Sequence, residues 1–347
     1  MTPFYVAITG DFLKPDGTWI ASDLGLSVLD TTPGVNYQFL PRGGPELTSD
    51  QVVDLDAVLV LSPRVTAPTV DRADRLLLVA RAGVGYDSVD VAACTKAGVI
   101  VTITPDGVRR PMALAAITLL LALTHRLLIK DRLTRDGCWD KRVNHFGTGL
   151  VERTLGVVGY GNIGREVARL GAGLYMRPIV ADPLIRPHAT ELEGVRLVDL
   201  PTLLSEADFV VICCPLSTQT YHLIDASALA QMKSTAFLIN VARGSIVDQT
   251  SLTRALSSGR IAGAGLDVFE TEPVSADDPL LRLDNVVVAP HSLGWTDDAF
   301  RDNGRSACQS IVDVAAGRVP RHVLNPDVLH HPKVKARLTP TVDEGAR

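Results

Sequence analysis

The sequence predicts an α/β protein built from two doubly wound parallel sheets. Short apolar runs alternate with helical stretches along most of the chain, which is typical of parallel strands joined by helical crossovers. The length of 347 residues gives room for two domains of ordinary size. The composition, 46% hydrophobic and 21% charged, supplies large cores and excludes disorder over most of the chain.

The first series of apolar runs predicts the strands of an N-terminal unit. These runs are Phe4–Thr9, Val58–Leu61, Leu76–Ala80 and Val99–Ile103. We then expect one long helix over Met112–Arg135. Its apolar part, Met112–Thr124, is shorter than the ~20 residues of a membrane span and ends at His125, so it predicts a helix buried between domains or subunits.

A second series of apolar runs predicts a second sheet. Its strands are Thr154–Val158, Pro178–Ala181, Phe209–Cys213, Ala236–Asn240, Gly263–Asp267 and Val286–Ala289. The helices expected between them are Ile163–Ala172, Leu200–Glu206, Ala226–Met232 and Gln249–Ser257. A further helix is expected over Asp297–Ala316. The last stretch, Pro332–Arg347, has almost no large apolar residues and predicts a loose tail.

Charge and cysteine content restrict the partners and the compartment. A net charge of −5 and a pI near 5.9 give no basic surface for nucleic acid or an anionic membrane. The five cysteines show no Cys-x-x-Cys spacing, so we expect free thiols and no metal site. The first residues lack the pattern of a signal peptide. These observations predict a cytoplasmic protein whose partner is a small molecule.

A glycine motif lies at the start of the second series. Gly159, Gly161 and Gly164 form a G-x-G-x-x-G pattern between a predicted strand and a predicted helix. In that context the first glycine makes a tight turn, the second admits a pyrophosphate, and the third allows close packing of strand and helix. The amides of Asn162 and Ile163, at the helix start, would lie nearest the phosphates.

Asp182 stands where a dinucleotide site places its ribose-binding carboxylate. It ends the next predicted strand, 18 positions after Gly164, close to the ~20 that is usual. A carboxylate there binds the 2′-hydroxyl of NAD and repels the 2′-phosphate of NADP, whereas Arg186 would favour that phosphate. On this balance we expect NAD. Gly83-Val84-Gly85 lacks a third glycine and is not a second nucleotide site.

Three further segments end predicted strands, and each carries one residue suited to the reduction of a keto acid. Arg243 can bind a carboxylate and polarise the adjacent carbonyl. His291 can deliver a proton to the developing alkoxide, and Glu272 can hold the imidazole in the right tautomer. Because strand ends converge on the ligand crevice of an α/β sheet, we expect these residues to form one site.

These segments, Asn240–Ser245, Gly265–Pro273 and Ala289–Gly294, together with the glycine motif, resemble the D-isomer-specific 2-hydroxyacid dehydrogenases. That family includes phosphoglycerate, glycerate and D-lactate dehydrogenases, and the resemblance extends from about Val6 to Leu324. It implies a flavodoxin-like substrate domain, a Rossmann NAD-binding domain, and NAD-dependent interconversion of a D-2-hydroxy acid and its 2-keto acid. Glu272, where the related formate dehydrogenases carry Gln, argues against formate as substrate.

The resemblance also implies the domain limits and the assembly. The substrate domain would comprise residues 1–105 and 294–330, the NAD-binding domain residues 106–293, and the tail residues 331–347. A homodimer would form through the apolar helix Met112–Leu128.

Residue by residue, the resemblance makes Arg243 the substrate-binding arginine, Glu272 the carboxylate partner and His291 the acid/base. The amides of Val84 and Gly85 would hold the substrate carboxylate, and Asp267 would bind the nicotinamide carboxamide. Further cofactor contacts would come from Pro215, Val241, Ala242, Arg243, His291 and Gly294.

The substrate is less determined. The chain departs from the family in carrying Trp295 close behind His291, and in lacking an acidic residue early in the long helix. Arg64 and Arg109 could bind a second anionic or polar group, as in a phosphoglycerate- or glycerate-like substrate, with Trp295 closing the pocket. Alternatively Arg64 is a solvated loop residue and Arg109 pairs with an acid such as Asp106.

Two other functions remain open. Some relatives of these enzymes are NAD-sensing co-regulators that keep the same three residues. Other relatives accept hydride from a non-carbon donor such as phosphite. We favour an enzyme over a co-regulator, because no long interaction tail flanks the predicted fold and the tail after Pro332 is short.

Overall fold

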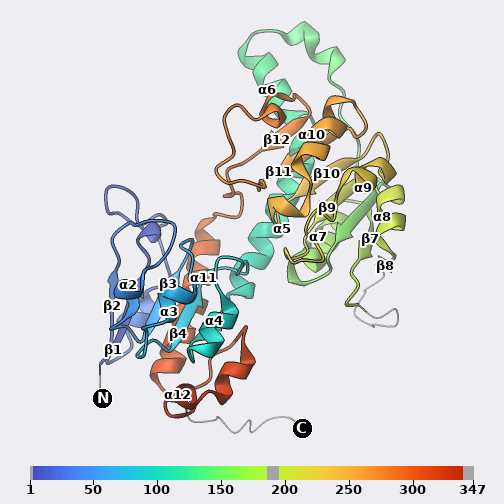
Figure 1. The fold of residues 1–347 in the computed structure, drawn as a ribbon. Coiled ribbons are helices and arrows are strands. Elements are labelled where there is room, and N and C mark those ends of the chain that lie inside the picture. Colours follow the sequence, from blue (N-terminus) through green and yellow to red (C-terminus); the bar gives the residue numbers. More distant parts are fainter. Residues whose placement is uncertain (1–2, 186–194, 339–347) are drawn as a thin grey trace. The chain divides into compact units, whose positions relative to one another are not determined.

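The computed structural model describes residues 3–185 and 195–338, so Arg186 and the end of the predicted tail lie outside the described residues. The chain divides into two compact units. Unit 1 comprises residues 1–108 and 295–347, and unit 2 comprises residues 109–294. Figure 1 shows the chain coloured along its sequence.

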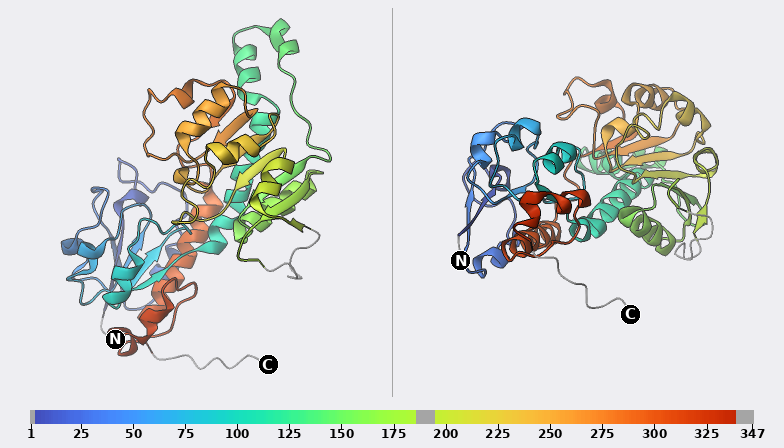
Figure 2. Two further views of the ribbon diagram at one scale, coloured as in Figure 1. Left: turned by 45° about the vertical axis from the view of Figure 1, so that its right-hand side comes forward. Right: turned by 60° about the horizontal axis from the view of Figure 1, so that its bottom comes forward.

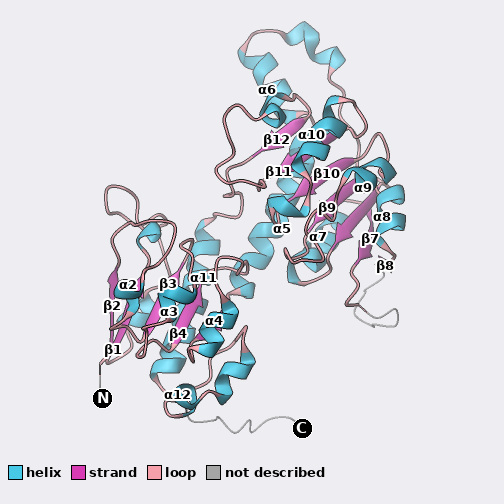
Figure 3. Cartoon of the chain, viewed as in Figure 1, coloured by secondary structure: helices cyan, strands magenta, loops and turns pink. Residues whose placement is uncertain are grey.

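Unit 1 is a parallel sheet with helices on both faces (Figure 3). Its strand order, β2-β1-β3-β4-β5, is the flavodoxin-like order. The strands are β1 (Phe4–Ile8), β2 (Val35–Phe39), β3 (Ala57–Val60), β4 (Leu78–Arg81) and β5 (Ile100–Thr102). The helices are α1 (Ser27–Asp30), α2 (Ser49–Val52), α3 (Ala67–Val70), α4 (Val91–Lys96), α11 (Asp297–Ala315) and α12 (Pro332–Lys335). Short 3₁₀ turns lie at η1 (Gly10–Phe12) and η6 (Pro326–His330).

The C-terminal part of the chain belongs to the core of unit 1. Helix α11 buries Phe300, Ala307 and Ile311 in the same hydrophobic cluster as β1 and β4. The side chain of Asn325, 6% exposed, accepts a hydrogen bond from the Val101 amide at 2.9 Å. The prediction of a loose tail from residue 332 is wrong as far as residue 338, because Val334 and Leu338 are buried in that cluster.

Unit 2 is also a parallel sheet covered on both faces. Its order, β12-β11-β10-β9-β6-β7-β8, places the reversal of strand order between β6 and β9, as in a Rossmann sheet. The strands are β6 (Thr154–Val158), β7 (Arg177–Ala181), β8 (Arg196–Leu197), β9 (Phe209–Ile212), β10 (Phe237–Asn240), β11 (Gly263–Leu266) and β12 (Val286–Val288). The two sheets confirm the predicted α/β class.

The helices of unit 2 follow the crossovers expected from the sequence. They are α5 (Pro105–Thr124), which begins in the last residues of unit 1, α6 (Leu127–Arg135), α7 (Asn162–Gly173), α8 (Leu200–Glu206), α9 (Ala226–Gln231) and α10 (Gln249–Ser257). Short 3₁₀ turns lie at η2 (Trp139–Asn144), η4 (Gly244–Ile246) and η5 (Pro279–Arg282). By length and composition α5 could cross a membrane, yet 56% of its apolar window is buried in the protein.

The predicted single helix over residues 112–135 is wrong. The chain leaves the helix after Thr124, whose carbonyl accepts the Thr148 amide at 2.8 Å, and Arg126 adopts a left-handed conformation at φ 51°. Helix α6 then runs out from the sheet of unit 2 with η2, as Figures 1 and 2 show. The break separates a buried helix from an exposed one, because α6 has no buried residue.

Candidate active site

The glycine loop lies at the reversal point of the unit 2 sheet. Gly159 has φ 90°, and a Cβ there would lie 2.7 Å from the Cα of Cys214, at the end of β9. A Cβ on Gly164 would lie 2.0 Å from the Gly159 carbonyl oxygen. A Cβ on Gly161 would meet nothing within 4 Å. Gly159 and Gly164 therefore allow close packing, and Gly161 leaves the open approach that a pyrophosphate needs.

The start of α7 differs from the starts of the helices that follow it. Helices α8, α9 and α10 begin at Asp199, Asp225 and Asp248, whose carboxylates accept a backbone amide of the first turn. Helix α7 begins at Gly161, with no side-chain cap. Its first amides are thus available to an anion, and the helix dipole favours negative charge there. The residues present fit a dinucleotide cofactor.

The carboxylate of Asp182 is already oriented by the backbone. One oxygen accepts the Tyr160 amide at 2.8 Å, and the other accepts the Leu184 amide at 2.9 Å. The bond from Tyr160 ties the end of β7 to the glycine loop, and the bond from Leu184 closes the turn that follows β7. Pro215 follows β9. It is exposed, and its carbonyl accepts a hydrogen bond from the Thr220 hydroxyl at 2.7 Å.

Arg243 lies in a turn organised by the last residue of β10. The buried side chain of Asn240 accepts the Ala242 amide at 3.0 Å and donates to the Arg243 carbonyl at 2.9 Å. The Arg243 guanidinium donates to the Ala242 carbonyl at 2.7 Å. Val241 is buried and Ala242 is partly buried. The fold therefore fixes the start of the arginine side chain while the guanidinium is only partly buried.

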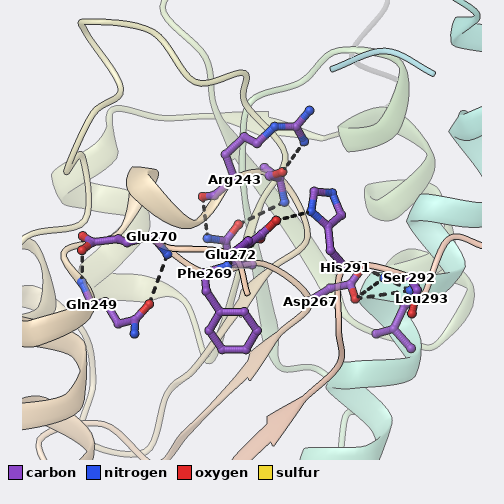
Figure 4. Close-up of polar contacts among 11 residues, drawn as sticks. Arg243, Gln249, Asp267, Phe269, Glu270, Glu272, His291, Ser292 and Leu293 are labelled. Carbon is purple, nitrogen blue, oxygen red and sulfur yellow. Dashed lines mark hydrogen bonds and ion pairs between the residues drawn. The ribbon is translucent and has the colours of Figure 1, made fainter. Parts of the chain in front are cut away.

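His291 and Glu272 form a close pair in unit 2 (Figure 4). His291 Nδ1 lies 2.7 Å from Glu272 Oε2, and Glu272 Oε1 accepts the Phe269 amide at 2.9 Å. The two side chains are 45% and 37% exposed, so the pair is accessible to a ligand. Because Nδ1 is engaged, Nε2 is the ring nitrogen left to exchange a proton with a substrate.

The electrostatics of this pair favour an ionised carboxylate. Burial by itself raises the pKa of Glu272, and the hydrogen bonds from His291 and from the Phe269 amide lower it. The positive charges of His291 and Arg243 act in the same direction. The pKa of Glu272 therefore lies below its usual value, which keeps a negative charge against the imidazole at neutral pH.

Asp267 holds the loop that carries His291. Its side chain is 1% exposed; one carboxylate oxygen accepts the Ser292 amide at 2.9 Å, and the other accepts the Leu293 amide at 3.2 Å. Burial raises the pKa of Asp267, and the two amides oppose that rise. Gly294 ends the same loop, where a Cβ would lie 2.4 Å from the Met112 sulfur.

In unit 1, Val84 and Gly85 follow β4 in a loop that is held in place by hydrogen bonds at Gly83. The Gly83 amide donates to the Thr104 hydroxyl at 2.6 Å, and that hydroxyl donates to Asn303 Oδ1 at 2.6 Å. Val84 and Gly85 are partly exposed, and among residues 3–185 and 195–338 no hydrogen bond from their amides is seen. Two adjacent free amides suit a carboxylate.

The remaining candidate residues are less constrained. Arg64 in unit 1 is exposed, and Trp295, 55% exposed, packs edge-on against Phe300 with ring centroids 5.4 Å apart. Arg109 in unit 2 is partly buried; its Nε has no partner in the described part of the chain. With Arg110 it contributes to lowering the pKa of Glu166, although the Arg169 hydrogen bond is the main cause. Asp106 lies 3.5 Å from His322.

Unit 2 thus gathers Arg243, Glu272, His291 and Asp267 at the carboxyl ends of its strands, as Figure 4 shows. Val84, Gly85, Arg64 and Trp295 belong to unit 1. The supporting residues Asn240, Thr104 and Asn303 were not predicted from the sequence. Of these, only Asn240 could have been found from the sequence, because it is the polar residue at the end of an apolar strand.

Comparison with known proteins supports this arrangement. Residues 117–292 match the family described as D-isomer specific 2-hydroxyacid dehydrogenase, NAD binding domain. The chain is 40% identical over 292 residues to a glyoxylate reductase of Thermococcus onnurineus, covering 82% of this chain and 87% of that protein. It is 37% identical over 276 residues to D-3-phosphoglycerate dehydrogenase of Archaeoglobus fulgidus, covering 79% of this chain and 52% of that protein.

The solved structures agree. A glyoxylate reductase from Paecilomyes thermophila has a TM-score of 0.82 at 25% identity, covering 94% of this chain and 99% of that one. The Rossmann sheet, the glycine loop and the histidine–glutamate pair define a nicotinamide-dependent oxidoreductase acting on a CH–OH group. More narrowly, the chain belongs to the D-isomer specific 2-hydroxyacid dehydrogenase family, as the sequence resemblance predicted. The family uses NAD or NADP.

Proposed function

We propose that this protein reduces a small 2-keto acid to its D-2-hydroxy acid with His291 as the acid and Arg243 as the substrate-binding residue. The observation that carries the proposal is the 2.7 Å contact between His291 Nδ1 and Glu272 Oε2. This contact fixes the imidazole and leaves Nε2 to donate the proton to the carbonyl oxygen. In the reverse direction the same nitrogen accepts the proton of the hydroxyl group.

Arg243 binds the substrate through its guanidinium. A planar guanidinium can hold a carboxylate and polarise the neighbouring carbonyl at the same time, which favours the charge that develops on the oxygen. We also assign the free amides of Val84 and Gly85, in unit 1, to carboxylate binding. When bound, the nicotinamide cofactor supplies the hydride in the reducing direction and accepts it in the other.

We assign the cofactor as NAD. Gly161, Asn162 and Ile163 would hold the pyrophosphate at the uncapped start of α7, and Asp182 would hold the ribose. A second negative charge beside the Asp182 carboxylate is unfavourable, which disfavours the 2′-phosphate of NADP. Pro215, Val241, Ala242, Asp267 and Gly294 would complete the cofactor site. In this assignment residues 106–293 bind the cofactor, and residues 1–105 with 294–330 bind the substrate.

Two observations bear on the substrate. Relatives at about 40% identity are named glyoxylate reductases, which makes glyoxylate the first candidate. Arg64 is exposed, and a positive charge there suits a keto acid with a second anionic or polar group, such as hydroxypyruvate or its phosphate. We assign Arg109 and Trp295 to substrate binding as well.

The test is NADH oxidation, followed at 340 nm, with glyoxylate, pyruvate, hydroxypyruvate and phosphohydroxypyruvate. We expect turnover with at least one acid, and a loss of about 10²–10⁴-fold in kcat for His291→Ala. Near-normal turnover by that variant would overturn the assignment of the acid. Tight NADH binding with no turnover of any acid would instead favour a sensor, and NAD reduction by phosphite alone would favour the non-carbon donor.

We also propose a homodimer in the cytoplasm. Helix α5 buries Ala113, Ala116, Leu119 and Leu120 within unit 2, so much of the apolar stretch predicted to form the interface is already buried inside one chain. Leu114 stays exposed on α5, and a larger group of exposed apolar residues lies beyond the break: Leu127, Leu128, Trp139, Val143 and Phe146. We therefore place the interface on α6 and η2. Light scattering that gives a monomer of 37.1 kDa would contradict it.

A further inference from the structure

Unit 2 contains a second histidine–glutamate pair beside the candidate active site. His222 Nε2 lies 2.6 Å from Glu270 Oε1. Glu270 precedes Glu272 by two residues, so one short segment carries two glutamates, each paired with a different histidine. The His222 and Glu270 side chains are 31% and 30% exposed, less than His291 and Glu272.

Glu270 is fixed at both its backbone and its side chain. Gln249, the first residue of α10, donates its amide to Glu270 Oε1 at 3.2 Å and accepts the Glu270 amide on its own Oε1, also at 3.2 Å (Figure 4). The Gln249 side-chain amide then donates to Asp278 at 2.7 Å. These bonds attach the Glu270 segment to the start of a helix, which is a rigid support.

His222 is attached to the turn that follows Arg243. Its amide donates to the Ser245 carbonyl at 2.9 Å, and the Ile224 amide donates to the Ile246 carbonyl at 3.0 Å. The ring stacks on Tyr221 with centroids 4.0 Å apart. The pair with Glu270 therefore connects the Arg243 turn to the segment that carries Glu272.

The two connected segments are in direct contact. A Cβ on Gly244 would lie 1.8 Å from the carbonyl carbon of Phe269, so no side chain separates the two backbones. The Phe269 amide in turn donates to Glu272 Oε1 at 2.9 Å. A shift of the Glu270 segment would thus move Glu272 relative to His291.

We propose that His222 and Glu270 are positioning residues for the reduction, and that they hold Glu272 in line with His291. This inference rests on the proposed function of His291 and Glu272. A partly exposed histidine–glutamate pair by itself contributes little to stability. Here the pair belongs to a set of hydrogen bonds that connects the Arg243 turn, the Glu270 segment and the start of α10. Its loss would therefore misplace Glu272. Asp248, at the start of α10, is a further charged group that interacts electrostatically with His222.

The first test separates kcat from binding. Glu270→Ala and His222→Ala should each lower kcat about tenfold, because small displacements of catalytic groups are costly. The KM for the keto acid and the Kd for NADH, measured by fluorescence, should change less than threefold. The matched control is Glu206→Ala, which removes the last residue of α8, a glutamate paired with Arg196 of β8. It should leave kcat unchanged.

Conservative variants test the geometry. Glu270→Gln keeps an oxygen that accepts from His222 and Gln249, and His222→Gln places an amide nitrogen near the position of Nε2. Each should restore at least half of the kcat lost in the alanine variant. No restoration, or equal losses in KM and kcat, would overturn the positioning role.

Hydrogen exchange gives a measurement that does not need turnover. The Phe269 amide is protected by Glu272, so Glu270→Ala should accelerate its exchange at least tenfold, whereas Glu206→Ala should not. Unchanged protection overturns the inference even if the enzyme is active. If the wild-type protein reduces no keto acid, the proposed function fails, and faster exchange of Phe269 in Glu270→Ala still supports the mechanical link.

Discussion

Replacing Gly244 with alanine tests whether the Arg243 turn and the Glu272 segment act as one unit. The new Cβ would lie 1.8 Å from the Phe269 carbonyl carbon, 2.0 Å from its oxygen and 2.3 Å from the Glu270 amide nitrogen. All three are backbone atoms, so a side-chain rotation cannot relieve the clash. Restoring an ordinary contact of 3.4 Å requires the two segments to separate by about 1.6 Å.

A separation of that size affects both stability and rate. Overpacking of this kind costs about 1–3 kcal/mol of unfolding free energy. A misplacement of catalytic groups by ~1 Å costs about 10²-fold in rate, so we expect kcat to fall about 100-fold.

The assay combines urea unfolding, followed by circular dichroism, with steady-state NADH oxidation. Gly173→Ala is the control, because a Cβ there meets nothing within 4 Å and the residue ends α7. It should leave kcat unchanged and stability unchanged or slightly raised. The reasoning is refuted if Gly244→Ala keeps kcat within threefold and unfolds at the same urea concentration as Gly173→Ala. In that case the two segments are not coupled.

Three further predictions concern the cofactor, the pH dependence and the substrate. Asp182→Ala should raise the KM for NADH about tenfold and reduce the preference over NADPH, because a charge-assisted hydrogen bond of ~1.5–3 kcal/mol is lost; steady-state kinetics with both cofactors measures it. Burial raises the pKa of Asp208, but hydrogen bonds from the Thr154 amide and Lys233 lower it overall. The stability from Asp208, about 1 kcal/mol, is therefore present above the unfolded-state pKa of ~3.9 and lost as pH falls through the lower folded-state value. Urea unfolding of Asp208→Asn should differ from wild type at pH 7 and not at pH 2. Arg64→Ala should raise the KM for phosphohydroxypyruvate at least tenfold with little change for pyruvate; equal effects on both would make Arg64 a solvated loop residue.

Local patterns predicted much of the fold. Buried parallel strands are continuous apolar runs, so strands such as β6 and β9 could be located within a residue or two. Strand β2 was missed because it lies at the edge of its sheet and alternates partly buried with exposed residues, the exposed ones being Asn36 and Gln38. The break at Arg126 was missed because the apolar pattern continues into Leu127 and Leu128, which the tertiary structure leaves exposed.

Residue types and their local spacing were enough to propose the reacting groups. Spacing along one strand–loop–helix unit is a local property, which is why the glycine loop, Asp182 and the polar ends of β10 and β11 were predictable from the residues alone. Which of those groups touch is a property of the folded chain. His291 and Glu272 are 19 residues apart, and His222 and Glu270 are 48 apart. Such contacts depend on how separate strands align in the sheet, and alignment is set by packing of the whole core, which no local segment encodes.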